Sequence, residues 1–258
     1  MNSIVSPLSV SWLPSLHTKP TPYKRLLSHK CLINHRLSLL SIQSISASSP
    51  KSTVCAVPPS EGTVSVIDFE NFVEKDWSFL EAGDLNSNEV ADRIISAGKV
   101  GKDSKVLIST GSEGFVDRVV ETSPCKQLLV VHDSLFVLAC IKEKYDKVKC
   151  WQGELIFVPE KWAPFDVVLL YFLPGLPFDL SQVFEALAKV CLPGARIVIS
   201  HPKGREGLEQ QKAEYPDVVV STLPDKSALE SAASHHLFTM ADFVDEPGFY
   251  LAVLAYTK

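Results

Sequence analysis

Hydrophobic and polar positions follow two alternating patterns from residue 86 to residue 258. In the first pattern, short and nearly continuous apolar runs recur, which is typical of strands that are covered on both faces. The run Phe-Asp-Val-Val-Leu-Leu-Tyr-Phe at 165–172 is the strongest of them. On this pattern we expect buried strands at residues 106–108, 128–131, 148–151, 165–172 and 196–199.

In the second pattern, apolar residues recur at helical spacing between these runs. Val137, Leu138, Ile141 and Tyr145 share one face of a predicted helix, and charged residues occupy the other face. The segment thus has the two-sided character of a helix that packs on a sheet.

Capping signals mark two further helices. Asn86 with Glu89, and Asp179 with Gln182, have the three-residue spacing of a capping box. Gly98 ends the first of these predicted helices.

Strands and helices that alternate in this way predict right-handed crossovers and a parallel sheet with helices on both faces. The end of the chain differs, because the predicted strands 237–243 and 249–256 are joined only by Val-Asp-Glu-Pro-Gly and must form an antiparallel hairpin. We therefore expect a doubly wound, Rossmann-like α/β fold. Its seven-stranded sheet is mostly parallel and ends in a C-terminal antiparallel hairpin.

The first 60 residues have a different composition from the rest. They contain no Asp, Glu or Gly, but 14 Ser and six Lys or Arg. This composition is typical of an organelle transit peptide, and abundant Ser and Pro with few arginines favour the chloroplast, with the stroma as destination. The alternative is a basic tail that stays attached. No apolar run in this segment is long enough for a membrane span.

These observations divide the chain into three parts. Residues 1–57 are predicted to be a disordered plastid transit peptide, with processing near Cys55. Residues 58–83 form a lead-in segment, and residues 84–258 form one domain, a size that buries a substantial core.

The charge of the chain changes once the leader is set aside. The remainder has 19 Lys and Arg against 30 Asp and Glu, a net charge of −11 before histidine. Such an acidic body has no electrostatic footprint for nucleic acid. Its four cysteines include no CxxC pair, and no histidine lies at zinc-ligand spacing, so we expect no metal site.

The sequence Lys-Val-Leu-Ile-Ser-Thr-Gly-Ser-Glu-Gly at 105–114 carries the candidate chemistry. A strand, a glycine-bearing turn and a helix bring backbone N–H groups close to a nucleotide-like ligand. Asp133 ends the second predicted strand, 19 residues beyond Gly114. At that position an acidic side chain lies at the edge where open α/β sheets bind ligands.

These two features and three later motifs resemble, in the same order, those of the class I S-adenosylmethionine-dependent methyltransferases. The later motifs are Gly153-Glu154, the strand start at 165–168, and Leu-Pro-Gly-Ala-Arg at 192–196. The resemblance covers residues 84–258 and implies S-adenosylmethionine as cofactor. It places Thr110, Gly111 and Gly114 in the cofactor-binding turn, Asp133 on the ribose hydroxyls and Glu154 near the adenine.

The first motif departs from the family pattern at three positions. Ile108 replaces an acidic residue, and Thr110 and Ser112 replace two of three glycines. Side chains at glycine positions obstruct close backbone approach, and one lost charge-assisted hydrogen bond is worth roughly 1.5–3 kcal/mol. We therefore expect weakened cofactor binding, unless a shifted turn at Gly111 and Gly114 restores the pocket.

Single residues at this edge carry alternative interpretations. Asp133 has the position of a helix cap as well as that of a ribose ligand, and Glu154 is otherwise a surface carboxylate. His201, after the fifth predicted strand, is the one weak candidate for a catalytic base. No fixed catalytic set is needed, because methyl transfer depends chiefly on positioning.

Two functions follow for this chain. The first is a plastid S-adenosylmethionine-dependent methyltransferase-like protein with an unidentified acceptor. The second is a non-catalytic binding or assembly module with a methyltransferase fold. In either case the apolar loop 171–178 is a candidate contact surface for an acceptor or a protein partner.

Overall fold

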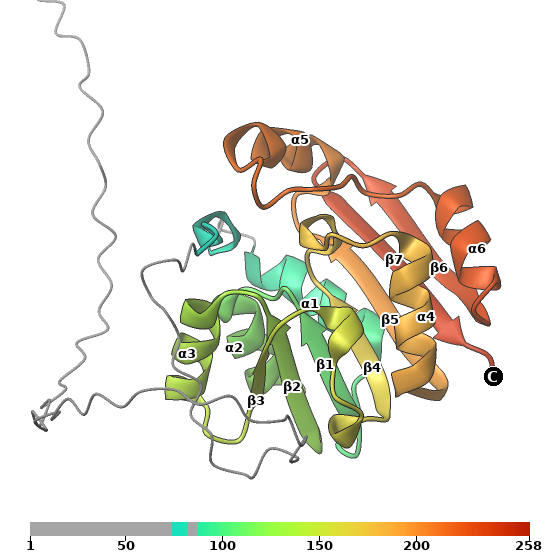
Figure 1. Ribbon diagram of the computed structural model, residues 1–258, viewed down its shortest axis with the longest axis horizontal. Helices are drawn as coiled ribbons and strands as arrows, with labels where there is room; N and C mark the ends of the chain where they lie inside the picture. Colours follow the sequence, from blue (N-terminus) through green and yellow to red (C-terminus); the bar gives the residue numbers. More distant parts are fainter. Residues whose placement is uncertain (1–73, 82–86) are drawn as a thin grey trace, which may run out of the picture. The chain divides into compact units, whose positions relative to one another are not determined.

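The computed structural model describes residues 74–81 and 87–258 of the chain. Their strands form one seven-stranded sheet in the order β3-β2-β1-β4-β5-β7-β6 (Figure 1). Only β7 runs antiparallel to its neighbours, β5 and β6. The predicted doubly wound α/β fold with a C-terminal antiparallel hairpin is confirmed.

The parallel strands follow the buried apolar runs of the sequence. Their side chains are enclosed because helices cover both faces of the sheet. The strands are β1 (Lys105–Ser109), β2 (Gln127–His132), β3 (Lys149–Gln152), β4 (Phe165–Leu170), β5 (Cys191–His201), β6 (Phe238–Glu246) and β7 (Phe249–Tyr256).

Six α-helices accompany the sheet in the described part of the chain. They are α1 (Ser87–Gly98), α2 (Glu113–Thr122), α3 (Leu135–Lys144), α4 (Leu180–Val190), α5 (Gly204–Glu214) and α6 (Lys226–Ser234). Helices α1, α2 and α3 lie on one face and α4 and α6 on the other, while α5 packs on β5 and β7 (Figure 1). None of the helices among these residues has the length and apolarity needed to cross a membrane.

The capping box predicted at Asp179 and Gln182 is present. The Asp179 carboxylate accepts the Gln182 amide N–H at 2.8 Å, and the Gln182 side chain accepts the Asp179 amide N–H at 3.1 Å. Helix α1 also ends at the predicted Gly98. Its proposed cap, Asn86, lies outside the described residues, as does the predicted transit peptide.

Two strands are longer than the sequence pattern indicated. Strand β5 begins at Cys191, so Pro193 and Gly194 lie inside it, where the register with β4 shifts between Phe165 and Val167. Strand β6 continues to Glu246, which shortens the hairpin turn to two residues. In both places hydrogen bonds to a neighbouring strand extend the β-structure beyond the apolar run.

Candidate functional site

The candidate site lies at the carboxyl edge of the sheet, where β1, β2 and β4 end side by side. The chain passes from β1 to β2 in one direction and from β4 to β5 in the other, so this edge contains the switch point at which open α/β sheets bind ligands. Segments that meet here are the turn after β1, the end of β2, the end of β3 and the loop after β4.

The turn after β1 retains the backbone geometry that a glycine would adopt. Thr110 has φ +51°, in the left-handed region that β-branched residues rarely occupy. Two hydrogen bonds hold it there: its amide donates to the Val131 carbonyl at 3.1 Å, and its hydroxyl donates to the Phe172 carbonyl at 3.1 Å. The Thr110 side chain therefore ties the turn to the loop after β4.

Gly111 permits close packing in the core beneath the turn. A Cβ atom on Gly111 would lie 2.6 Å from the Ile108 side chain and 3.6 Å from Phe115. Ile108 itself is fully buried. The missing side chain of Gly111 thus leaves room for the packing of β1 against α2. Gly111 is not among the residues that line the small cavity at this edge of the sheet.

The N-terminus of α2 is occupied by groups of the protein itself. The Ser112 hydroxyl accepts the Phe115 amide N–H at 3.1 Å and caps the helix. The Glu81 carboxylate accepts the amide N–H of Glu113 and, at 3.2 Å, that of Gly114. A carboxylate at this end is favoured by the exposed N–H groups and by the helix dipole.

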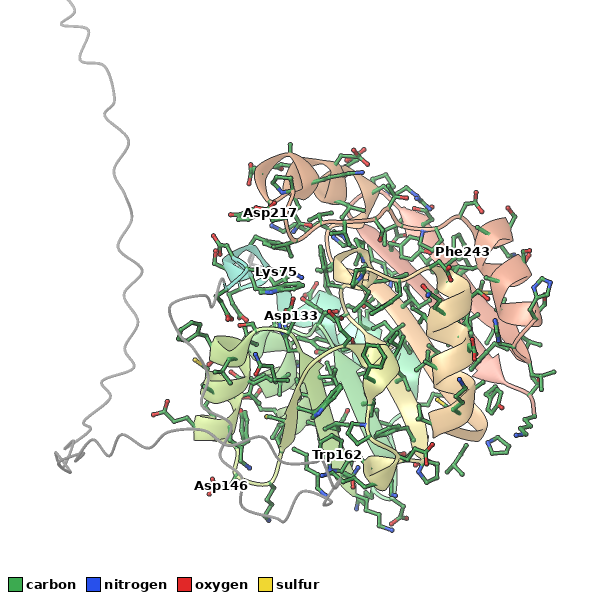
Figure 2. The ribbon with its side chains drawn as sticks, viewed as in Figure 1. Lys75, Asp133, Asp146, Trp162, Asp217 and Phe243 are labelled. Atoms are coloured by element: carbon green, nitrogen blue, oxygen red, sulfur yellow. The ribbon has the colours of Figure 1, made fainter. Side chains whose placement is uncertain are left out.

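Asp133 lies at the end of β2, as predicted, and forms an ion pair with a residue of the lead-in segment. Its Oδ2 atom is 2.8 Å from Lys75 Nζ, and Figure 2 shows the two side chains close together. Burial raises the pKa of the Asp133 carboxyl, but His132 and Lys75 lower it more, so the pKa lies below its ordinary value. Asp133 is therefore ionised at neutral pH and already neutralised by a cation.

Glu154 faces the same cleft from the end of β3. Burial, and then the negative charge of Asp133, raise the pKa of its carboxyl. The structure thus brings Glu154, Asp133 and Thr110 together around one small cavity. Gly114 lies at a separate hollow beside Glu81.

Trp77 fills the centre of the cleft. Its ring makes edge contacts with His132 at a centroid distance of 4.6 Å and with Phe172 at 6.2 Å, and only 5% of the residue is exposed. A Cβ atom on Gly175 would lie 2.7 Å from the Trp77 ring. Phe79 extends the cluster through a tilted ring contact with Tyr215, at a centroid distance of 4.6 Å.

Little space remains once these side chains are in place. The cavity has a volume of about 10 Å³, enough for roughly one water molecule, whereas small-molecule sites measure about 300–1,000 Å³. A nucleotide-sized cofactor does not fit while residues 74–81 hold this position. The cavity is lined by Trp77, Ser109, Thr110, Val131, His132, Asp133, Gly153, Glu154, Leu155, Gly175 and Leu176.

His201, the weak candidate for a base, is not part of this cleft. It is the last residue of β5, has no exposed surface, and uses Nε2 to bond the Gln211 side chain at 2.9 Å. Burial lowers the pKa of His201 to about 4. The proposal for His201 is corrected: it is a neutral residue of the core without access to a substrate.

The loop 171–178 is also not the free contact surface that its apolar sequence suggested. Residues 171–176 are buried. Tyr171 stacks on Phe115 at a centroid distance of 4.3 Å, and Phe172 packs against Phe79 at 5.3 Å. The apolar character of this loop is explained by packing within the domain.

The residues that the sequence did not reveal are those that fill the cleft. They are Lys75, Trp77 and Glu81. All three lie in the lead-in segment, residues 58–83, whose sequence has no periodic pattern. The one signal was a pair of aromatic residues, Trp77 and Phe79, in a polar stretch. Within residues 74–81 and 87–258, no three His, Cys, Asp or Glu side chains gather as a metal site.

Comparisons by sequence give no relatives for this chain. No protein-family model matches it, and no protein of curated function matches it significantly.

Solved structures do match it in fold. A chain of the complex between the Haloferax volcanii Trm112 methyltransferase activator and the protein assigned as the methyltransferase has a TM-score of 0.55 at 13% identity, over 66% of this chain and 89% of that one. The N-methyltransferase NodS of Bradyrhizobium japonicum WM9 with S-adenosyl-L-homocysteine gives 0.54 at 11%, over 70% and 92%.

The mitomycin 7-O-methyltransferase MmcR gives a TM-score of 0.55 at 12% identity, over 69% of this chain and 56% of that enzyme. These identities are too low to transfer an activity, and the likeness concerns the fold alone. It is consistent with the strand order and the antiparallel β7 of this chain. The chain has the fold of the class I S-adenosylmethionine-dependent methyltransferases.

Proposed function

We propose that this chain is a plastid methyltransferase-fold protein that binds S-adenosylmethionine weakly. One observation carries this proposal: the position where the fold family binds its cofactor is retained in the backbone but filled by the protein's own Trp77. Binding therefore costs the free energy of displacing residues 74–81. The apparent Kd equals the Kd of the open cleft divided by the fraction of molecules in which the cleft is open.

The residues that remain favour some binding once the cleft is open. Thr110 has the turn geometry of a glycine, and Asp133 is an ionised carboxylate at the end of β2. Ile108, in contrast, offers no charge to the cofactor because it is fully buried. The pocket thus offers two of the three acidic residues that the family pattern has, Asp133 and Glu154.

The plastid part of the proposal rests on composition. The leader is rich in Ser, basic and free of Asp and Glu, as plastid transit peptides are. The methyl acceptor stays unidentified.

A non-catalytic binding or assembly module is the second candidate. The observation that favours it is the closed cleft together with the buried, neutral His201. In this alternative the filled cleft is permanent and the fold serves as a scaffold.

Calorimetric titration of the native chain with S-adenosylmethionine, with ATP as the control nucleotide, tests the proposal. We expect a Kd from tens of micromolar to about one millimolar, equivalent to roughly 4–6.5 kcal/mol. A submicromolar Kd would contradict weakened binding, and absence of heat at several millimolar would favour the non-catalytic module.

A further inference from the structure

Residues 74–81, here called the plug segment, contact the end of β2, the N-terminus of α2 and the loop after β4 at the carboxyl edge. Lys75 pairs with the Asp133 carboxylate at 2.8 Å. Glu81 accepts the N–H groups at the N-terminus of α2. Trp77 and Phe79 occupy the apolar space between them and pack on Phe172.

Two charged residues of the plug segment meet groups of the edge. Lys75 meets the ionised Asp133 carboxylate at the end of β2, and the Glu81 carboxylate accepts the N–H groups at the start of α2, although burial raises the pKa of Glu81. Both contacts are partly or fully exposed to solvent, since 35% of the Lys75 side chain is accessible and the Glu81 contacts lie at the surface. Exposed ion pairs are weak because solvent screens them, so these ends of the segment separate easily.

The centre of the plug segment is held by burial. Trp77 is 5% and Phe79 is 7% exposed, and the burial of these two aromatic side chains stabilises the docked segment. A 3₁₀ turn, η2 (Ser78–Leu80), closes this short stretch. The segment therefore has an affinity of its own for the cleft, concentrated in two rings.

Polar atoms at the base of the cleft give an independent sign of a ligand site. Ser109 Oγ and His132 Nε2 are buried, and no group in the described part of the chain bonds them. Both residues line the cavity. His132 Nδ1 is engaged within the protein, 2.9 Å from the Ser134 amide nitrogen and 3.3 Å from Asp133 Oδ1, which leaves Nε2 as the unbonded ring nitrogen. A purely structural core would pair such groups, whereas a site for a polar ligand keeps them.

We infer that the plug segment is an intramolecular ligand that competes with S-adenosylmethionine for this cleft. The inference rests on the proposed function and names its regulation: removal of the segment opens the cofactor site, and return of the segment closes it. Because the competitor is part of the same chain, its effective concentration is in the millimolar range. Weak intrinsic contacts are then sufficient to keep the cleft filled.

The test compares three full-length proteins: the native chain, Lys75→Ala/Trp77→Ala, and the matched control Lys161→Ala/Trp162→Ala. The control removes another Lys–Trp pair, 4.9 Å apart, at the opposite end of the sheet, where Figure 2 shows Trp162. Calorimetry measures the Kd for S-adenosylmethionine. We expect the plug variant to bind at least tenfold more tightly than the native chain, and the control to bind like the native chain.

A second arm measures the plug segment itself. A fluorescein-labelled peptide of residues 74–81 is titrated with each protein and followed by anisotropy. An occupancy of 90–99% at a millimolar effective concentration corresponds to a Kd of about 10–100 μM for the peptide. The plug variant should bind it in this range, while the native chain and the control should not, because their own segment blocks the cleft.

If the double variant does not fold, Lys75→Glu, which keeps the Trp77 ring, replaces it in both measurements.

The outcomes separate the two proposals. Equal Kd values for S-adenosylmethionine in all three proteins would overturn the competition and leave the proposed weak binding intact. Peptide binding to the plug variant without any cofactor binding would overturn the proposed function and retain the segment as a ligand of the cleft. Tighter cofactor binding and peptide binding, both confined to the plug variant, would support both.

Discussion

Thr110 and Ile108 show how single residues of the first motif act in this fold. Thr110 has a left-handed backbone, at φ +51°, which a glycine would adopt without strain, and its hydroxyl donates to the Phe172 carbonyl. Ile108 takes the place of a family acid and packs beneath Gly111. The sequence showed that both positions had changed, but not that one change preserves the turn while the other belongs to the core. That distinction depends on φ and burial, which no residue pattern contains.

This difference predicts a small change in stability for one substitution and a large loss for another. Thr110→Gly relieves about 1–2 kcal/mol of left-handed strain and loses a hydrogen bond worth about 0.5–1.5 kcal/mol, so the free energy of unfolding should stay within about 1 kcal/mol of the native value. Ile108→Asp buries an unpaired carboxylate and should cost at least about 3 kcal/mol. Urea unfolding of both variants measures this. A stable Ile108→Asp protein would show that this side chain reaches a cation or solvent.

His201 predicts a pH dependence of stability. Its pKa of about 4 in the folded protein lies below the unfolded value of about 6.5. The unfolded chain therefore binds this proton first, so the stability is complete above pH 6.5 and falls as the pH drops toward 4. Between pH 7 and pH 5 the native chain should lose about 2 kcal/mol more than His201→Gln. Urea unfolding at both pH values checks it, and parallel losses in the two proteins would refute the assignment.

At the scale of elements, the apolar runs predicted the parallel strands, and the residue spacing predicted the capping box at Asp179 and Gln182, because burial on both faces and capping are encoded locally. The cap of α3 is Ser134, and not Asp133. The plug segment was not predicted. Its contacts join residues 58 positions apart, as in the Lys75–Asp133 pair, and the segment is too short for a periodic pattern. Its role is visible only when β1, β2 and β4 meet in space.

A substitution at Gly175, in the loop after β4, should disturb the plug segment because Gly175 lies against the Trp77 ring. A Cβ atom there would lie 2.7 Å from Trp77 and 3.0 Å from Phe172, so Gly175→Ala should weaken the docking of the segment by about 1–2 kcal/mol. Hydrogen exchange at the Leu80 and Glu81 amides, which bond within η2, should then accelerate about 5- to 30-fold.

Gly101→Ala is the control for this experiment. Its Cβ atom would meet only the Ser104 hydroxyl, at 3.5 Å. Unchanged exchange at Leu80 and Glu81 in Gly175→Ala would mean that the Trp77 ring does not contact this wall in solution.

For the whole molecule, the resemblance predicted the fold but not the state of its site. The order of strands and the antiparallel β7 follow from crossover spacing and a short hairpin, which are properties of the backbone. Cofactor binding depends on side chains that converge from four separate segments. Of the predicted ligands, Asp133 and Glu154 meet at one cavity with Thr110, Gly111 belongs to the core, and Gly114 lies beside Glu81.

The composition of the leader predicts the destination of the whole chain. Residues 1–60 fused to a fluorescent reporter should direct it into plastids, since the segment is rich in Ser and free of acidic residues. A matched fusion in which the six Lys and Arg residues are replaced by Glu should remain in the cytosol. Cytosolic fluorescence from the unmodified leader fusion would contradict the proposed location.

The central claim is that the protein's own Trp77 fills the cofactor cleft. The most direct measurement is the nuclear Overhauser effect between the Trp77 and His132 rings, whose centroids lie 4.6 Å apart. We predict clear cross-peaks in the ligand-free native protein and their loss at saturating S-adenosylmethionine. Absence of these cross-peaks in the ligand-free protein would show that the cleft is open, and would contradict the account.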